Sequence, residues 1–159
     1  MNTNNNNNGT SHENSGDYYD VNKPGSRIPL GYRQNNPLNI RYSASNAWRG
    51  KLPNNGSGYE CFVSMPYGFR AALVLLRKYI KSDKLDTIRK MIYKWAPPSD
   101  NNATENYISH VSSWSGIPQN QVLNPDDPNT MIPIAYAMAR SENGYFPLMS
   151  DVKEGWNLI

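Results

Sequence analysis

The chain is organised around residues 128–147, which read P-N-T-M-I-P-I-A-Y-A-M-A-R-S-E-N-G-Y-F-P. Apolar side chains recur in this stretch at the spacing of one helical face, which predicts an amphipathic helix. The members of this face are Met131, Ile134, Ala135, Met138 and Ala139. Asn129 and Thr130 offer N-cap oxygens, and Pro133 is placed in the first turn, where proline is tolerated. Gly144 is expected to end the helix in the C′ position.

The last turn of this predicted helix carries one carboxylate, Glu142. The helix macrodipole is negative at that end, so the position disfavours the charged form and tends to raise the pKa of the carboxyl group. A general acid that works near neutral pH needs such a pKa. The alternative is a solvent-exposed glutamate near a helix end with no chemical role.

The length of 159 residues fits one domain with a sizeable core. Residues 1–22 are rich in Asn, Gly, Ser and Asp and contain almost no aliphatic side chain, so we expect a disordered tail followed by a domain over residues 23–159. The tail has neither a basic n-region nor an apolar h-region, so no signal peptide is expected. No apolar run in the sequence is long enough for a membrane span.

The formal net charge is +3 and the sequence pI about 8.9, with Lys and Arg densest over residues 70–94. This pattern favours a solvated helical face, and no motif for nucleic-acid binding is present. The single cysteine, Cys61, excludes an intrachain disulfide framework. The only histidines are His12 and His110, which together with one cysteine are too few for a structural zinc site. We therefore expect no metal and no cofactor.

The first part of the predicted domain is rich in turn-forming residues. Residues 23–38 contain many Pro, Gly and Asn, which predicts an extended arm. Leu38 and Ile40 then alternate with polar neighbours, which predicts a short strand, and residues 59–63 offer a second strand that completes a small β-hairpin. The asparagines of this strip either shape a loop through Asx turns or line a polar groove with amides.

Three further helices are expected after the hairpin, over residues 67–81, 86–95 and 104–114. Val122 and Leu123 are expected to make a small satellite contact. The fold class is therefore mostly α (α+β), with four helices and a minor β-hairpin that forms a cleft.

Four segments carry a resemblance to a known group of proteins. They are R-Q-N-N-P-L-N-I-R-Y (33–42), W-R-G (48–50), F-V-S-M-P-Y-G-F-R-A-A-L (62–73) and T-I-R-K-M-I-Y-K-W-A-P-P-S-D-N-N-A-T-E-N-Y-I (87–108). The sequence resembles phage virion and lysis proteins that are often labelled structural proteins, after the murein-degrading particle protein of an enveloped double-stranded RNA phage. That group is similar to lytic transglycosylases of the lysozyme superfamily. The resemblance runs from residue 33 to about residue 144 and implies a lysozyme-like helical domain.

The order of parts differs from the common arrangement of a transglycosylase, in which the helix ending in the catalytic glutamate precedes the asparagine-rich strip. Here the strip comes first and the helix with Glu142 comes last. We interpret this as a circular permutation, because a site is defined in space and not along the chain. Glu60, in G-Y-E-C-F, is the alternative catalytic residue, and alternation places Glu60 and Phe62 on one side of their segment.

The resemblance implies cleavage of the β-1,4 bond between N-acetylmuramic acid and N-acetylglucosamine in peptidoglycan. A muramidase normally uses two carboxylates, whereas a transglycosylase uses one glutamate, first as acid and then as base on the muramic C6 hydroxyl. In the resembling proteins Asn and Tyr side chains hold the N-acetyl groups. The positions that this implies here are Asn36, Asn39, Asn102 and Tyr107, with Arg41 and Trp95 near the groove. Trp95 also suits a core position, and Arg41 also suits a surface ion pair.

Two other classes of function remain open at this point. The first is a non-catalytic structural virion protein with the same fold. The second is a peptidoglycan endopeptidase built on Cys61 and His110. The resemblance places the protein in a phage virion or the infected-host cytoplasm, acting on the bacterial cell wall. The partners it implies are peptidoglycan glycan strands, and other virion proteins through the N-terminal tail.

Overall fold

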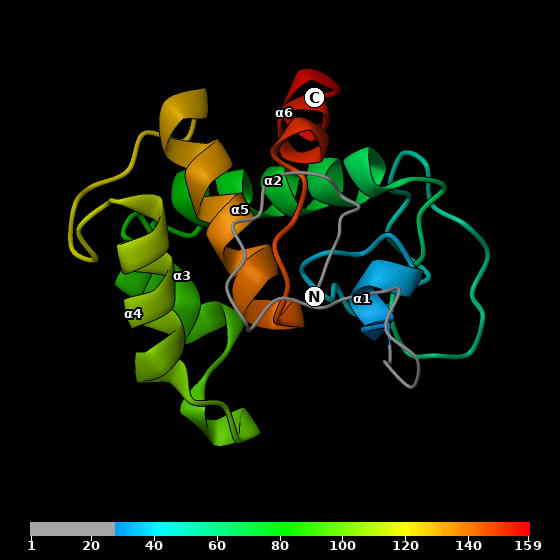
Figure 1. Cartoon of the computed structure of the whole chain (residues 1–159), viewed down its shortest axis with the longest axis horizontal. Coiled ribbons are helices and arrows are strands. Elements are labelled where there is room, and N and C mark those ends of the chain that lie inside the picture. Colours follow the sequence, from blue (N-terminus) through cyan, green and yellow to red (C-terminus); the bar gives the residue numbers. More distant parts are fainter. Residues whose placement is uncertain (1–27) are drawn as a thin grey trace, which may run out of the picture.

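The computed structural model describes residues 28–159, and its regular elements within this range are helices (Figure 1). They are α1 (Leu30–Arg33), α2 (Met65–Lys81), α3 (Ile88–Trp95), the 3-10 helix η1 (Pro98–Asp100), α4 (Thr104–Ser115), α5 (Pro128–Asn143) and α6 (Met149–Asn157). The mostly helical class is thus confirmed. The expected disordered tail, residues 1–22, lies outside the described range. None of the helices described is long and apolar enough to cross a bilayer.

Helix α5 occupies the middle of the molecule, where it packs against α1, α2, α4 and α6 (Figure 1). Its predicted apolar face is fully buried, together with Ala137. Two details of the prediction were wrong. The N-cap is Asp127, whose carboxylate accepts from the Asn129 N–H at 2.9 Å and from the Thr130 hydroxyl at 3.1 Å. Because the helix therefore begins at Pro128, Pro133 lies inside it, in the second turn.

Two helices were missed by the sequence patterns. Helix α1 interrupts the arm that was predicted to be extended. Helix α6 packs along α2, so closely that a Cβ on Gly155 would lie 2.7 Å from Cβ of Phe69 and 2.9 Å from the Pro66 carbonyl oxygen. A glycine inside a short helix weakens the helical signal, yet here the missing side chain is what lets the two backbones approach. The helix count of four was therefore too low.

The predicted β-hairpin does not form as a pair of strands. Residues 28–159 contain two isolated antiparallel bridges, Arg41 with Tyr59 and Lys51 with Phe62. Asn39, inside the predicted first strand, adopts a left-handed backbone with φ of 54°, which breaks the extended path. The strip of residues 35–41 is therefore a loop that meets the second predicted segment in one antiparallel bridge, and the predicted hairpin is not confirmed.

The amide of Asn36 takes the place of a strand partner in this loop. Its Nδ2 donates to the carbonyl oxygens of Ile40 and Glu60 at 2.9 and 3.0 Å, and its Oδ1 accepts from the Ile40 N–H at 2.9 Å. These bonds tie the strip to the segment around Glu60. Of the predicted satellite pair, Leu123 is buried in the main core, whereas Val122 is 70% exposed.

Candidate functional site

A polar cleft of about 420 Å³ runs between the 35–41 strip, the end of α3 and the end of α5. Chain segments that are far apart in the sequence contribute to its walls. They include Asn39, Arg41, Asn46, Tyr59, Tyr79, Trp95, Asp100, Asn102 and Glu142. Five of the eight residues proposed from the sequence thus line one cavity.

Glu142 is half-buried in the wall of this cleft and accepts three hydrogen bonds. Asn39 Nδ2 donates to Oε1 at 2.9 Å. Trp95 Nε1 and the Tyr107 hydroxyl both donate to Oε2, at 3.2 and 2.8 Å. The donors come from the strip, α3 and α4, so the tertiary fold fixes the carboxylate from three directions. Oε1 receives a single bond and keeps capacity for a proton.

Tyr107 is a permanent hydrogen-bond donor to this carboxylate. Burial raises its pKa well above the ordinary value of 10, and the charge of Glu142 and the hydrogen bond to it act in the same direction. The phenol therefore stays neutral at any physiological pH. It holds one oxygen of Glu142 and leaves the other facing Asn39.

The strip and the end of α5 are joined beside Glu142 by Asn143. Its Nδ2 donates to the Pro37 carbonyl oxygen at 2.8 Å and to the Ala139 carbonyl oxygen at 2.9 Å. Gly31 permits this close approach, since a Cβ there would lie 2.6 Å from Oδ1 of Asn143 and 2.8 Å from Oδ1 of Asn39. Helix α1, which the sequence patterns missed, therefore backs the side chain that holds Glu142.

Trp95 belongs both to the core and to the cleft. Its ring packs against the main core and meets Tyr79 edge to face, with centroids 6.1 Å apart and planes at 66°. Its indole N–H reaches the cleft at Glu142. Both interpretations of Trp95 drawn from the sequence thus describe part of what it does.

Arg41 and Asn102 lie on the open side of the cleft. Arg41 is exposed, with its Cζ 6.0 Å from the Tyr59 ring centroid, and no carboxylate of the described residues is paired with it. Asn102 is exposed and donates from Nδ2 to the Pro97 carbonyl oxygen at 3.0 Å, which leaves its Oδ1 toward solvent. Both side chains are placed to meet a polymer that enters the cleft.

Asn36 and Glu60 do not line the cleft. Asn36 is 1% exposed, and its amide is fully used by backbone groups of the strip. Glu60 is 0% exposed; its Oε2 pairs with Lys51 Nζ at 3.2 Å and accepts from the Ser43 N–H at 3.1 Å. Both side chains hold the loop together, so the structure corrects the binding role expected of Asn36 and disfavours Glu60 as the acid.

The cleft also contains a second carboxylate, Asp100, which was not named among the site residues predicted from the sequence. It ends η1, the short 3-10 helix that begins at the second proline of W-A-P-P-S-D. The double proline ends α3 and predicts that the loop of residues 99–103 lies at the edge of the cleft, where the structure places Asp100. Its presence means that a two-carboxylate mechanism has the residue types it needs.

The thiol and the imidazole proposed for a peptidase have separate partners. Cys61 is buried and accepts a hydrogen bond from Gln34 Nε2 at 2.6 Å. His110 is exposed on α4, where its ring stacks on Trp114 and Nδ1 lies 3.4 Å from Ser141 Oγ. The two side chains form no dyad. Within the described residues, no group of three or more His, Cys, Asp or Glu side chains is arranged to hold a metal ion.

The fold and the cleft together define a mostly helical protein with one glutamate held by three donors in a polar groove. No protein-family model matches the sequence. The chain is similar to "Protein P5" of Pseudoalteromonas phage PM2, with 37% identity over 130 residues, a match that covers 79% of each chain. The chain therefore belongs to the family of this phage protein.

Proposed function

We propose that this protein cleaves the glycan strands of peptidoglycan, as a lytic transglycosylase or a related muramidase, with Glu142 as the general acid and base. The observation that carries the proposal is the position of Glu142: one carboxylate, in a polar cleft, fixed by Asn39, Trp95 and Tyr107. The three donors come from three segments and hold the carboxylate in one position, with Oε1 toward Asn39.

The chemistry follows from the free capacity of Oε1. Protonated Glu142 gives its proton to the bridging O4 oxygen as the C1–O4 bond of N-acetylmuramic acid breaks, and positive charge develops at C1. The resulting carboxylate then takes the proton from the C6 hydroxyl while O6 bonds to C1, which closes a 1,6-anhydro ring. No water is consumed, and the glutamate returns to its protonated form.

The other side chains of the cleft bind and orient the glycan. The exposed amide of Asn102 and the guanidinium of Arg41 offer hydrogen-bonding groups to the N-acetyl and hydroxyl groups of successive sugars. Trp95 and Tyr107 hold the carboxylate at a fixed distance from the bond that breaks. Positioning of this kind supplies a large part of the barrier reduction in bond cleavage.

The deciding experiment is mass spectrometry of the soluble muropeptides released from purified sacculi. Anhydro ends, lighter by one water, identify a transglycosylase, and reducing ends identify a muramidase. Asp100→Asn should leave the yield of anhydro products unchanged, because a transglycosylase needs one carboxylate; loss of products in this variant would favour the two-carboxylate route. Free peptide ends would indicate a peptidase, and no release at all would refute the proposal in favour of a non-catalytic virion component.

We further propose that the protein acts on the wall as part of a phage programme, since its relative is a phage protein. Attachment to other virion proteins through the N-terminal tail belongs to this proposal. Deleting residues 1–22 tests it: purified particles should lose the protein while its activity on sacculi is retained. Retention of the truncated protein in particles would contradict the attachment.

A further inference from the structure

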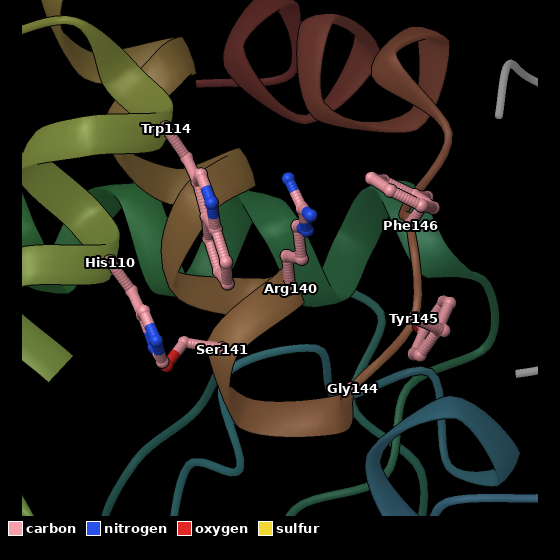
Figure 2. Close-up of a pocket in the computed structure, with 7 residues that line it drawn as sticks. All are labelled: His110, Trp114, Arg140, Ser141, Gly144, Tyr145 and Phe146. Atoms are coloured by element: carbon pink, nitrogen blue, oxygen red, sulfur yellow. The ribbon is translucent and has the colours of Figure 1, made fainter. Parts of the chain in front are cut away.

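A second cavity, of about 170 Å³, lies between α4 and the end of α5 and has no part in the chemistry above (Figure 2). Its lining is aromatic with one cation. The residues are His110, Trp114, Arg140, Ser141, Gly144, Tyr145 and Phe146, and we name this cavity the arginine pocket.

The guanidinium of Arg140 is held between two rings. Its Cζ lies 3.8 Å from the centroid of the Trp114 ring and 4.1 Å from that of Phe146, and Figure 2 shows the side chain between them. Cation–π contacts of this kind occupy the faces of the guanidinium and leave its N–H groups available at the edge. Within residues 28–159 no carboxylate is paired with Arg140 and no protein acceptor takes one of its N–H groups. The rings therefore orient this cation at the wall of the pocket, with its N–H groups not used by any acceptor of residues 28–159.

Two further polar groups, on His110 and Ser141, line the same pocket. The His110 ring stacks on Trp114, with centroids 4.6 Å apart and planes at 6°, and its Nδ1 lies 3.4 Å from Ser141 Oγ. Figure 2 shows Ser141 and His110 pointing toward one another at the lower rim of the pocket. The planar fork of N–H donors of Arg140 is the group that would bind a carboxylate, and Ser141 and His110 line another part of the same pocket. The ring walls suit the amide and alkyl groups that a carboxylate on a peptide would bring.

The arginine pocket adjoins the cleft through both of its helices. Ser141 directly precedes Glu142 on α5, and His110 lies about one turn beyond Tyr107 on α4. The arginine pocket and the site in the cleft are therefore built on the same two helices, since α5 carries Glu142 and α4 carries its donor Tyr107. In peptidoglycan, each muramic acid carries a peptide stem with free carboxylates, at the sugar whose C1–O4 bond is broken.

We propose that the arginine pocket binds a carboxylate of the peptide stem while the glycan occupies the cleft. This inference rests on the proposed function, because it takes peptidoglycan as the substrate. Arg140 supplies the paired N–H donors, Trp114 and Phe146 hold the guanidinium in plane, and Ser141 adds a hydroxyl. The pocket thus makes the enzyme selective for muramic acid that still bears its peptide.

The first test measures binding without catalysis. The probes are a stem tripeptide with free carboxylates and the same peptide in amidated form. Binding of each is followed by the NMR chemical shift of the Trp114 indole N–H. The Trp114→Phe variant, which lacks this signal, assigns it. The acid form should bind roughly tenfold or more tightly than the amide, as expected when charge-assisted bonds are lost. Arg140→Gln should abolish this difference and Ser141→Ala should reduce it, while Lys94→Gln, which removes the same charge from the exposed face of α3, should leave it intact. Equal binding of the two peptides by the wild type would overturn the proposal.

The second test separates this proposal from the proposed function. Wild-type protein should digest intact sacculi faster than glycan strands whose stems have been removed by an amidase, and Arg140→Lys, which lacks the planar fork, should lose this preference. Thermal melting identifies variants that fail to fold. If the variants at Arg140 fail to fold, Ser141→Ala is used in their place. If sacculi are cleaved but no variant changes the preference, the pocket assignment is wrong and the enzyme assignment stands. If the acid peptide binds at Arg140 but no substrate is cleaved, the enzyme assignment is wrong and the carboxylate site stands.

Discussion

Replacement of Glu142 by glutamine is the sharpest test of the site, because the structure predicts how each contact responds. The glutamine carbonyl oxygen can take the place of Oε2 and accept from Trp95 and Tyr107. The new NH2 group then faces Asn39, whose amide presents its oxygen when it turns over. All three hydrogen bonds survive in neutral form, each worth about 1 kcal/mol in place of the ~1.5–3 kcal/mol of a bond to a charged group. The loss is partly offset because a charge no longer has to be buried, so we expect a stability change of about 1–2 kcal/mol.

Replacement by alanine has a different expected effect on folding. The Tyr107 hydroxyl, the Trp95 indole N–H and the Asn39 amide each lose their acceptor. A buried donor left without a partner costs about 1–3 kcal/mol, and less where water can enter from the cleft. Glu142→Ala should therefore be about 2–4 kcal/mol less stable than the wild type. Urea unfolding of both variants, followed by tryptophan fluorescence, measures the two values.

Activity should fall equally in the two variants, although their stabilities differ. Both variants lack the transferable proton, so release of muropeptides from sacculi should fall by roughly two orders of magnitude or more in each, including in the stable glutamine variant. Glu60→Gln is the matched control and should keep most activity. Because this variant loses the ion pair with Lys51, it is assayed below its own melting temperature. A folded Glu142→Gln with near wild-type release would refute the assignment. An inactive but folded Glu60→Gln would refute the interpretation of the chain as a circular permutation.

Three further outcomes are expected. In Glu142→Gln the Tyr107 phenol should titrate at lower pH than in the wild type, because the charge and the charged hydrogen bond that raise its pKa beyond the effect of burial are gone; the ultraviolet difference against Tyr107→Phe measures this. Hydrogen bonds from Arg89 and then Tyr93 lower the pKa of Glu105 from 4.5 to about 2, so its contribution to stability is present above pH 4.5 and is lost as the pH falls through 2. Glu105→Gln should thus melt below the wild type at pH 6 and together with it near pH 2. Gly31→Ala should displace the amide beside the carboxylate and reduce activity about tenfold or more with the helices retained, as read by circular dichroism.

The helices that could be predicted are those whose own sequence carries the signal. Helices α2, α3, α4 and α5 each have an apolar stripe at helical spacing and end at a glycine, a proline pair or a polar turn. Helix α6 has Gly155 in its interior and is helical because it packs on α2. Its apolar residues Met149, Val152 and Trp156 do fall at helical spacing, but a segment of 9 residues with an internal glycine is a weak helical signal by itself.

The failed hairpin has a related cause. Alternation at Leu38 and Ile40 is real, and both side chains are buried. The backbone nevertheless turns at Asn39, and the Asn36 side chain supplies the hydrogen bonds that a neighbouring strand would have supplied. Asparagine is the residue type that does both, since it tolerates positive φ and bonds to nearby backbone. The two interpretations of the asparagine strip therefore each hold for different members: Asn36 shapes the loop, and Asn39 faces the cleft.

In the candidate site, too, some residues could be predicted from the sequence and others could not. Glu142 was marked by its place at a helix end, and the resemblance supplied Asn39 and Tyr107. The fold brings the three side chains within hydrogen-bond distance, although they are separated by up to 103 positions in the chain. The arginine pocket was not predicted, because a cavity made by two helices and a loop has no signature in any one of them.

The contacts around Glu142 are compatible with the interpretation of the chain as a circular permutation. What positions Glu142 is a set of contacts between the end of α5 and the strip: Asn143 bonded to the Pro37 carbonyl oxygen, and Asn39 bonded to Glu142 itself. Gly31 makes room for both amides. Each of these contacts joins segments that are far apart in the sequence, with 103 positions between Asn39 and Glu142 and 106 between Pro37 and Asn143. The position of the Glu142 carboxylate is thus set by tertiary packing, which does not require one particular order of the segments along the chain.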